Sequence, residues 1–514
     1  MCFLRKYYGY NHRIEKGDPI LANTIRQNRP QGKPVIMLVI DTLMDSPLQE
    51  AVKTGKAKAL KFLMEHGQYY HKFVAPFPTM SVNVDTTLLT GTYCNQHGIP
   101  GLVWFSKEEK RLINYGTHYR ELFKLGMGQA IEDFLFNLNE KHISHKVVTI
   151  HEELENRGRD SASINALVYR GNTAHPLNLP KILTTFTNID KNRSAKASKL
   201  FSFGRFSKLH PSNRYQYFWK KLGVNDASSV LQLSHLINNN ALPCFSIVYL
   251  PELDQRIHKN GRMDLKGIEK ADKQLQKIFN LYDTWEKALE ENIWIVLGDN
   301  GQAWVGPERG EAIIDLRNLL GRYRIMQIAK GIQPTDELVL AVNDRMAYIY
   351  TMDRENLPLQ EIAKILQKDD RIDVIAWKTG RNIEVRSGGL RGEFMFGPEG
   401  EYHDQYGQSW FLQGDQNLLN LSVSGKEIKY GEYPDALARL YSCLLSHKGD
   451  FLVVSARPGH EIIGEGSPVH IGGAGHGGLH EQDSVVPIII TGTDSSPPYL
   501  RMVDLKKWIL SLID

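Results

Sequence analysis

The sequence predicts an α/β protein in which helices sandwich a largely parallel central sheet. Short apolar runs, rich in β-branched residues, alternate with stretches of helical periodicity. The runs cover residues 34–41, 161–169, 244–254, 292–301, 451–456 and 485–492. Continuous apolar runs of this length are typical of strands buried on both faces of a parallel sheet. Their alternation with helical segments favours a layered α/β fold.

The remaining segments suggest how the chain is organised. Residues 48–67 and 268–291 show helical spacing of apolar side chains, whereas residues 105–160 and 185–226 are predicted as helical and loop insertions. Residues 343–400 are predicted to form strand, helix, strand and hairpin, which indicates a smaller inserted α+β subdomain. We therefore divide the chain into a first core part with helical insertions (1–342), the inserted subdomain (343–440) and a completing core segment (441–514).

The composition excludes several classes of protein. The 514 residues are 42% hydrophobic, and 62 basic side chains nearly balance 58 acidic ones, so a nucleic-acid polymer is not an expected partner. No stretch approaches the roughly 20 apolar residues of a membrane helix, and the N-terminus has no apolar leader. We expect a cytoplasmic protein without a membrane partner, in which the scattered cysteines are reduced thiols. The sequence predicts no oligomeric state.

Acidic residues follow three of the predicted strands. Asp41, Asp254 and Asp299 stand at the ends of the first, third and fourth runs. In open α/β sheets, ligands bind beyond the carboxyl ends of the strands. The three carboxylates are therefore expected to face one crevice.

The stretch "PFPTMSVNVDTTLLTG", residues 76–91, places Ser81 just before a predicted helix. Serine is a favoured N-cap, because its oxygen accepts a hydrogen bond from a free backbone N–H group. A serine at a helix N-terminus can also act as a nucleophile toward a bound anion. Both interpretations stay open on this stretch alone.

Further residues suited to metal binding occur in "DQRIH" (Asp254 and His258), "DNG" (Asp299 and Asn300) and "GAGHGGLHEQDSVVP" (His476 and His480). Carboxylates and imidazoles are the ligands that zinc, manganese and related divalent ions accept. Each motif alone is weak evidence. Their placement at the ends of successive predicted strands is more specific.

In this order the motifs resemble those of the alkaline phosphatase superfamily, and within it the type I phosphodiesterase and nucleotide pyrophosphatase branch. The hydroxyl residue Ser81, the Thr90–Gly91 pair that ends its helix and the "HGI" at residues 97–99 match that branch. The resemblance covers residues 34–105, 244–302 and 450–492. It implies an alkaline phosphatase-like fold, a small phosphate-ester substrate, two divalent metal ions and Ser81 as the nucleophile.

The resemblance also implies how the ligands divide. One site, suited to zinc, would use Asp254, His258 and His476. A second would use Asp41, Ser81, Asp299 and Asn300. His476 is assigned rather than His480 because it precedes Asp483 by the family spacing of seven residues.

The second site departs from the family pattern, since Asn300 stands where the family has a histidine. A carbonyl oxygen in place of an imidazole nitrogen favours harder ions, so this site is predicted to take zinc, manganese, magnesium or calcium. Sulfatases also carry "DNG", but the residues after Ser81 lack their S-x-P-x-R motif, which argues against that class.

Two residues are candidates for substrate binding. The family often has an asparagine where Leu102 stands, and Asn83 is the proposed substitute. Trp104 is a candidate for stacking on a base, with core packing as the alternative.

The leading hypothesis is a metal-dependent phosphodiesterase, similar to a nucleotide pyrophosphatase, that acts through a phosphoserine on Ser81. The alternatives are a phosphomonoesterase or sugar-phosphate mutase of the same superfamily, and a metal-binding scaffold with little turnover.

Overall fold

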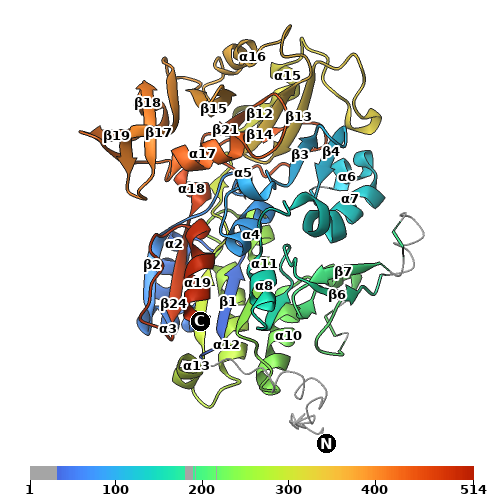
Figure 1. The fold of residues 1–514 in the computed structure, drawn as a ribbon, viewed down its shortest axis with the longest axis vertical. Helices are drawn as coiled ribbons and strands as arrows, with labels where there is room; N and C mark the ends of the chain where they lie inside the picture. The colour runs from blue at the N-terminus through green and yellow to red at the C-terminus, as the bar shows by residue number, and fades with distance from the viewer. Residues whose placement is uncertain are drawn as a thin grey trace, which may run out of the picture.

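The structure is a computed structural model and describes residues 32–117, 119–179, 189–190, 193–212, 214–215 and 217–513. Two sheets organise it (Figure 1), one in the lower half of the view and one in the upper half. Helices α4 (Ser81–Thr90), α5 (Cys94–His97) and α17 (Ala436–Leu444) lie between them (Figure 1).

The lower sheet has the strand order β2-β24-β10-β1-β9-β5-β8. Strands β10, β1, β9, β5 and β8 are parallel to their neighbours in this group, which confirms the predicted central sheet. The bounds are β1 (Val35–Ile40), β2 (Gln68–Val74), β5 (Ser161–Ile164), β8 (Leu200–Ser202), β9 (Phe245–Leu250), β10 (Ile293–Leu297) and β24 (Val485–Thr491).

Helices cover both faces of this sheet, because alternate strand residues point to opposite sides. In β1, Val35, Met37 and Val39 pack into one core cluster with α4, η1, α8 and α19. The alternate β1 residues, Ile36, Leu38 and Ile40, pack into a second core cluster on the opposite face, with α2, α3, α10, α11, α12 and α13. The bounds are η1 (Asp133–His142), α8 (Ile150–Asn156), α19 (Leu505–Ile513), α2 (Asp45–Lys53), α3 (Lys58–Glu65), α10 (Asp226–Asn238), α11 (Glu252–Asn260), α12 (Leu265–Phe279) and α13 (Trp285–Glu291).

The upper sheet has the strand order β13-β14-β21-β15-β16-β17-β20-β19, with β18 beside β17. Helix α16 (Leu359–Leu366) packs into one apolar cluster with its strands and α17 into another. Most of residues 343–440, predicted as an inserted α+β subdomain, lie in this sheet and its helices, but the sheet also includes β13, which begins at Leu338, and β21, which follows residue 440. The bounds are β13 (Leu338–Asn343), β14 (Met346–Thr351), β15 (Ile372–Thr379), β16 (Asn382–Arg386), β17 (Phe394–Asp404), β18 (Ser409–Gly414), β19 (Leu421–Ser424), β20 (Glu427–Tyr430) and β21 (Phe451–Ala456).

Two predicted strands take other places than expected. The run at 451–456 forms β21, which lies antiparallel between β14 and β15 in the upper sheet. The run at 485–492 forms β24, which joins the lower sheet antiparallel to β10. An apolar run indicates burial on both faces but specifies neither the direction of a strand nor its sheet.

Several predicted segments are divided. The 48–67 pattern forms α2 and α3, separated by a turn in which Gly55 has φ of +70°. The 105–160 region contains α6 (Tyr119–Leu125) and α7 (Met127–Glu132), and parts of the 185–226 region lie outside the described residues. The other elements are β3 (Val103–Ser106), β4 (Arg111–Asn114), β6 (Thr173–Pro176), β7 (Ser194–Ala197), η2 (Phe218–Gly223), β11 (Ala303–Trp304), α14 (Arg309–Ala312), β12 (Ile313–Asp315), α15 (Leu316–Leu319), η3 (Ile328–Lys330), η4 (Gln416–Leu419), β22 (Glu461–Ile463), β23 (Ala474–Gly475), α18 (Glu481–Ser484) and η5 (Met502–Asp504).

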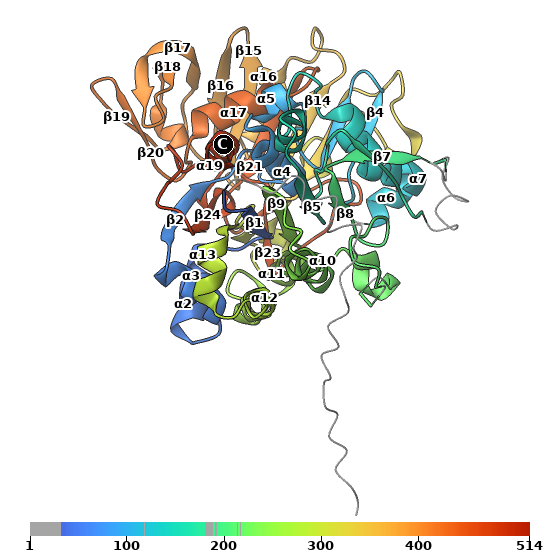
Figure 2. The ribbon, with the colours of Figure 1, turned by 60° about the horizontal axis from the view of Figure 1, so that its bottom comes forward.

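Within the described part of the chain, no helix combines the length and apolar character needed to cross a bilayer. Cys94, Cys244 and Cys443 are buried free thiols, and Cys2 lies outside the described residues. Figure 2 shows the two sheets and their helices from a second direction.

Candidate active site

The register of the central sheet brings two of the predicted carboxylates together. Val39 on β1 pairs with Leu297 on β10, and both side chains belong to the cluster that packs against α4. Asp41 and Asp299 each follow two residues later, beyond the carboxyl ends of these strands. Both are buried.

Hydrogen bonds fix Asp299 in this position. The backbone N–H of Thr42 donates to Asp299 Oδ1 over 2.9 Å, and the Tyr249 hydroxyl donates to Asp299 Oδ2 over 2.9 Å. Tyr249 lies on β9 directly opposite Val39. The carboxylate is thus held by groups from both strands that flank the crevice.

Asp254 and His258 lie one turn apart on α11, so they share a face of the helix. Leu253 and Ile257 are buried in the core cluster, which leaves Asp254 and His258 on the cavity side. Their shortest contact, His258 Nε2 to Asp254 Oδ1, is 3.2 Å.

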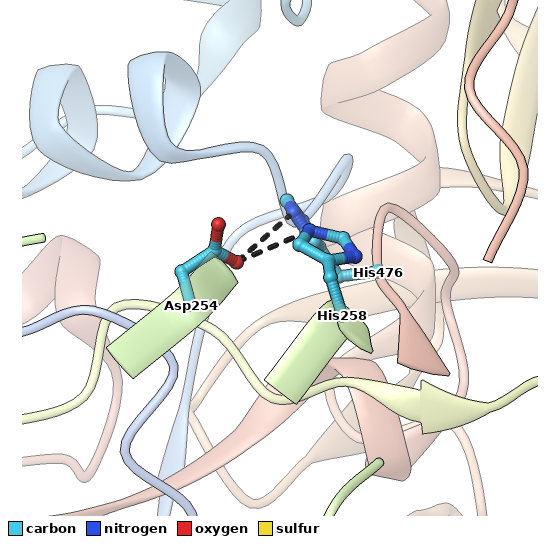
Figure 3. A group of neighbouring side chains, drawn as sticks. All are labelled: Asp254, His258 and His476. Carbon is cyan, nitrogen blue, oxygen red and sulfur yellow. Dashed lines mark ion pairs between the residues drawn. The ribbon is translucent and has the colours of Figure 1, made fainter. Parts of the chain in front are cut away.

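His476 completes this group from the segment after β23. Its Nε2 lies 3.9 Å from Asp254 Oδ1, and both imidazoles point toward that carboxylate (Figure 3). The three residues offer ligand atoms that all lie within 4.8 Å of one another. One carboxylate and two imidazoles in this arrangement suit a zinc ion.

Both rings are oriented through their other nitrogen. His258 Nδ1 is 2.8 Å from the carbonyl oxygen of Ala474, and His476 Nδ1 is 2.7 Å from that of Thr79. Metal-binding histidines commonly donate their second ring N–H to such an acceptor, which fixes the ring and its tautomer. The Nε2 atom of each ring is then the available ligand.

Ser81 is the first residue of α4, and Met80 is its N-cap without a side-chain capping bond. Of the two interpretations of Ser81, that of a helix cap is therefore wrong, because the helical backbone begins at Ser81 itself. The predicted end of the helix is confirmed: Gly91 takes the left-handed conformation, with φ of +65°.

Ser81 lines a cavity of about 550 Å³ together with Asp41, Asp254, His258 and His476. Much of the remaining wall is apolar and comes from α6, α7 and η1, including Leu122, Met127, Ile131 and Phe134. The structure thus brings the Ser81 hydroxyl, two carboxylates and two imidazoles into one cavity, of which another part of the wall is apolar.

The charges in the crevice are unevenly balanced. Burial raises the pKa of Asp41 well above its usual value, and the nearby Asp299 and Asp254 carboxylates raise it further. Burial opposes ionisation of Asp254, but His258, His476 and Thr42 outweigh it and lower its pKa. Burial alone would lower the pKa of His258, but the neighbouring Asp254 carboxylate has the larger effect and raises the pKa to about 9. A divalent cation would relieve the repulsion among these carboxylates.

The residues of the second predicted site fit a cation. Asn300 is fully buried, and its Nδ2 donates to the carbonyl of Gly301 over 3.1 Å. Its Oδ1 has no hydrogen-bond partner among the described residues. An unpartnered buried carbonyl oxygen beside the Asp41 and Asp299 carboxylates is a set of hard oxygen donors.

The two candidate substrate-binding residues lie elsewhere. Asn83 is buried, with Nδ2 donating to the carbonyl of Pro78 over 2.7 Å, and it does not line the cavity. Trp104 is buried and packs edge-on against His142 and His447, also away from the cavity lining.

Two polar residues of the site escaped the sequence analysis. The Thr42 hydroxyl donates to Asp254 Oδ1 over 3.1 Å, and Gln302 Nε2 donates to the same oxygen over 2.6 Å. Thr42 directly follows Asp41, and Gln302 lies two residues after Asn300. Their proximity to strand-end acids was the available signal.

Residues 35–388 match the family model of type I phosphodiesterase / nucleotide pyrophosphatase. The match covers more than half of the chain and includes the strand-end carboxylates, Ser81 and the "DQRIH" motif. The chain therefore belongs to the type I phosphodiesterase and nucleotide pyrophosphatase family, as its motifs predicted.

Solved structures agree with this fold. Murine ectonucleotide pyrophosphatase/phosphodiesterase 5 superposes with a TM-score of 0.53 at 12% identity, covering 94% of this chain and 95% of its own. Phosphonoacetate hydrolase from Sinorhizobium meliloti, in complex with phosphonoformate, gives 0.54 at 15% identity and covers 94% and 96%. Human ectonucleotide pyrophosphatase/phosphodiesterase 5 gives a TM-score of 0.53 at 13% identity and covers 94% of this chain and 95% of its own. A search of curated proteins gave no match.

Proposed function

We propose that the protein is a divalent-metal-dependent hydrolase of small phosphate esters that acts through a phosphoserine on Ser81. One observation carries the proposal: Ser81, at the N-terminus of α4, opens into the same cavity as Asp41, Asp254, His258 and His476. Asp254, His258 and His476 would hold one ion, and Asp41, Asp299, Asn300 and Ser81 a second. Zinc suits the first set, and zinc, manganese, magnesium or calcium the second.

When bound, the cations would lower the pKa of the serine hydroxyl and neutralise charge on the phosphoryl oxygens. The N-terminus of α4 and the Ser81 hydroxyl carry out substrate binding and phosphoryl transfer. The N-terminus of α4 directs backbone N–H groups toward an anion. Ser81 Oγ forms a bond to phosphorus as the bond to the ester oxygen breaks. The serine proton leaves with the released alcohol. Water then adds its hydroxyl group to phosphorus as the Ser81 Oγ–phosphorus bond breaks, and its other proton restores the Ser81 hydroxyl.

The substrate would present an apolar group beside its phosphate. The wall formed by Leu122, Met127, Ile131 and Phe134 supports this, because burying apolar surface there favours binding. Asn83 and Trp104 are also proposed to contact the substrate. Both are buried outside the cavity lining, so this contact requires the backbone around them to move. The free buried thiols support the proposed cytoplasmic location.

Hydrolysis of bis(p-nitrophenyl) phosphate and of p-nitrophenyl phosphate, each with zinc, manganese or calcium, tests the proposal. We expect metal-dependent release of p-nitrophenol by the wild type and loss of at least about 10³-fold in rate for Ser81→Ala. The matched control is Ser144→Ala. Equal rates for wild type and Ser81→Ala would overturn the mechanism, and transfer of phosphate without release of free phosphate would favour a mutase.

A further inference from the structure

A second group of metal-ligand side chains meets His258 within the active-site cavity. His258, Asp344 and His470 offer ligand atoms that all lie within 4.8 Å of one another. The rings of His258 and His470 are stacked, with centroids 4.1 Å apart. Asp344 and His470 also line the cavity that contains Ser81. Neither belongs to the motifs that identify the family.

The His470 ring is held as the two other imidazoles are. Its Nδ1 lies 2.5 Å from Glu461 Oε1, and its backbone N–H donates to Glu461 Oε2 over 2.9 Å. Glu461 is fully buried, so this carboxylate is a fixed partner. A buried carboxylate that holds one ring nitrogen, leaving the other free, is the usual support of a metal-binding histidine.

His447 and His480 lack this arrangement. His447 uses both ring nitrogens, Nε2 with the Tyr350 hydroxyl and Nδ1 with Ser446. His480 uses Nδ1 to accept a hydrogen bond from the Gln482 backbone. His470 is distinguished by a carboxylate on Nδ1 and by its place in the cavity wall.

Asp344 reaches the cavity from the upper sheet. It occupies the two-residue turn between β13 and β14 with φ of +51°, a left-handed conformation that is unfavourable for a non-glycine residue. The turn is anchored on both sides: Ile462 N donates to the Asp344 carbonyl over 2.9 Å, and Arg345 N donates to the His476 carbonyl over 3.0 Å. The Asp344 carboxylate accepts no hydrogen bond from the residues that the structure describes.

We propose that His258, Asp344 and His470 form a further cation site, distinct from the one formed by Asp254, His258 and His476, that takes a divalent transition metal such as zinc. Two imidazoles and one carboxylate are a suitable donor set for this ion. Because His258 Nδ1 is engaged with Ala474, its one free nitrogen serves both groups. The two groups are therefore alternative positions for a single ion, and both use His258 as a ligand.

Metal binding, rather than turnover, tests this inference and does not depend on the proposed hydrolysis. Zinc titration calorimetry and cobalt absorption spectra are measured on Asp254→Asn/His476→Gln, which lacks two ligands of the first site. We expect this variant to retain a cobalt spectrum typical of nitrogen ligation. The Asp41, Asp299 and Asn300 set offers oxygen ligands alone and cannot give that spectrum.

Adding His470→Gln to this background should remove the nitrogen-type cobalt spectrum and weaken zinc binding at least about tenfold, and Asp344→Asn should do the same. Adding Glu461→Gln, which alters only the support of His470, should weaken binding by about 10–100-fold. His145→Gln, an exposed histidine, is the control and should leave binding unchanged. Near-ultraviolet circular dichroism confirms that each variant is folded.

The inference is overturned if the folded Asp254→Asn/His476→Gln variant shows no nitrogen-type cobalt spectrum. It is also overturned if His470→Gln and Asp344→Asn both leave that spectrum and the zinc affinity unchanged.

Discussion

His476 Nδ1 donates a hydrogen bond to the carbonyl oxygen of Thr79 over 2.7 Å. Thr79 precedes Ser81 by two residues in the sequence. The Thr79 hydroxyl in turn accepts a hydrogen bond from Gly477 N over 2.8 Å. Thr79 thus joins the segment that carries His476 to the segment that leads into Ser81. All of these groups are buried except Ser81, which is partly buried.

Replacing Thr79 with valine should disturb this link. The Gly477 N–H loses its buried acceptor, at a cost of about 1–3 kcal/mol in the free energy of unfolding. The Thr79 carbonyl that accepts from His476 Nδ1 is retained in this variant, but the adjoining Gly477 backbone loses its anchor, so zinc affinity, measured by titration calorimetry, should fall by up to about tenfold. Thr79→Ser restores the hydroxyl and should recover most of the affinity. Equal affinities for Thr79→Val and wild type would show that this bond does not position the ligand.

Asn300→His should convert the second predicted site toward the family pattern. An imidazole nitrogen in place of the Asn300 amide oxygen should raise zinc affinity at the Asp41 and Asp299 carboxylates at least about tenfold, measured as a second binding event in calorimetry. Asn356→His, at an exposed position, is the control. An unchanged second event in a folded Asn300→His variant would argue against Asn300 as a ligand.

Arg345 and Asp483 form a fully buried ion pair, with Arg345 Nε 2.9 Å from Asp483 Oδ1. Arg345→Met leaves the Asp483 carboxylate buried without its partner, so we expect a loss of about 3–5 kcal/mol in the free energy of unfolding, measured in urea. The control pair, Arg381 with Glu399, is exposed. Arg381→Met should cost less than about 1 kcal/mol. Similar losses for both variants would contradict the electrostatic account.

His151 gives a prediction about pH. Burial lowers the pKa of its imidazole to about 3, whereas an unfolded histidine titrates near about 6.5. Between these values the unfolded chain binds a proton that the folded chain does not, so the stabilisation is complete above about pH 6.5 and declines as the pH falls.

The test compares wild type with His151→Gln in urea at several pH values. Below about pH 6.5, wild type should lose about 1.4 kcal/mol per pH unit relative to the variant, because groups that titrate in both proteins cancel in the difference. A difference between wild type and His151→Gln that stays constant with pH would contradict a neutral buried imidazole.

The strand-end carboxylates could be predicted from the sequence. An apolar run indicates a buried strand of an α/β sheet, and an acidic residue directly after it lies at the carboxyl end of that strand. Asp41 and Asp299 meet because Val39 and Leu297 are in register. The role of Ser81 as a helix cap could not be settled, since the sequence does not show at which residue the helical backbone begins.

Asp344 and His470 could not be predicted as neighbours of the site. Asp344 reaches the cavity because the β13–β14 turn docks against the segment carrying His476, which is a property of tertiary packing. The strand at 451–456 was assigned to the central sheet for a related reason. Its apolar side chains are equally compatible with the upper sheet, where β14 and β15 flank it.

Trapping the covalent intermediate tests the central claim most directly. The metal-loaded protein is mixed with bis(p-nitrophenyl) phosphate, quenched in acid during turnover, digested and analysed by mass spectrometry. We predict a phosphoryl adduct on the peptide that contains Ser81, and none in Ser81→Ala. Steady turnover with Ser81 unmodified, and an undiminished rate in Ser81→Ala, would contradict the account.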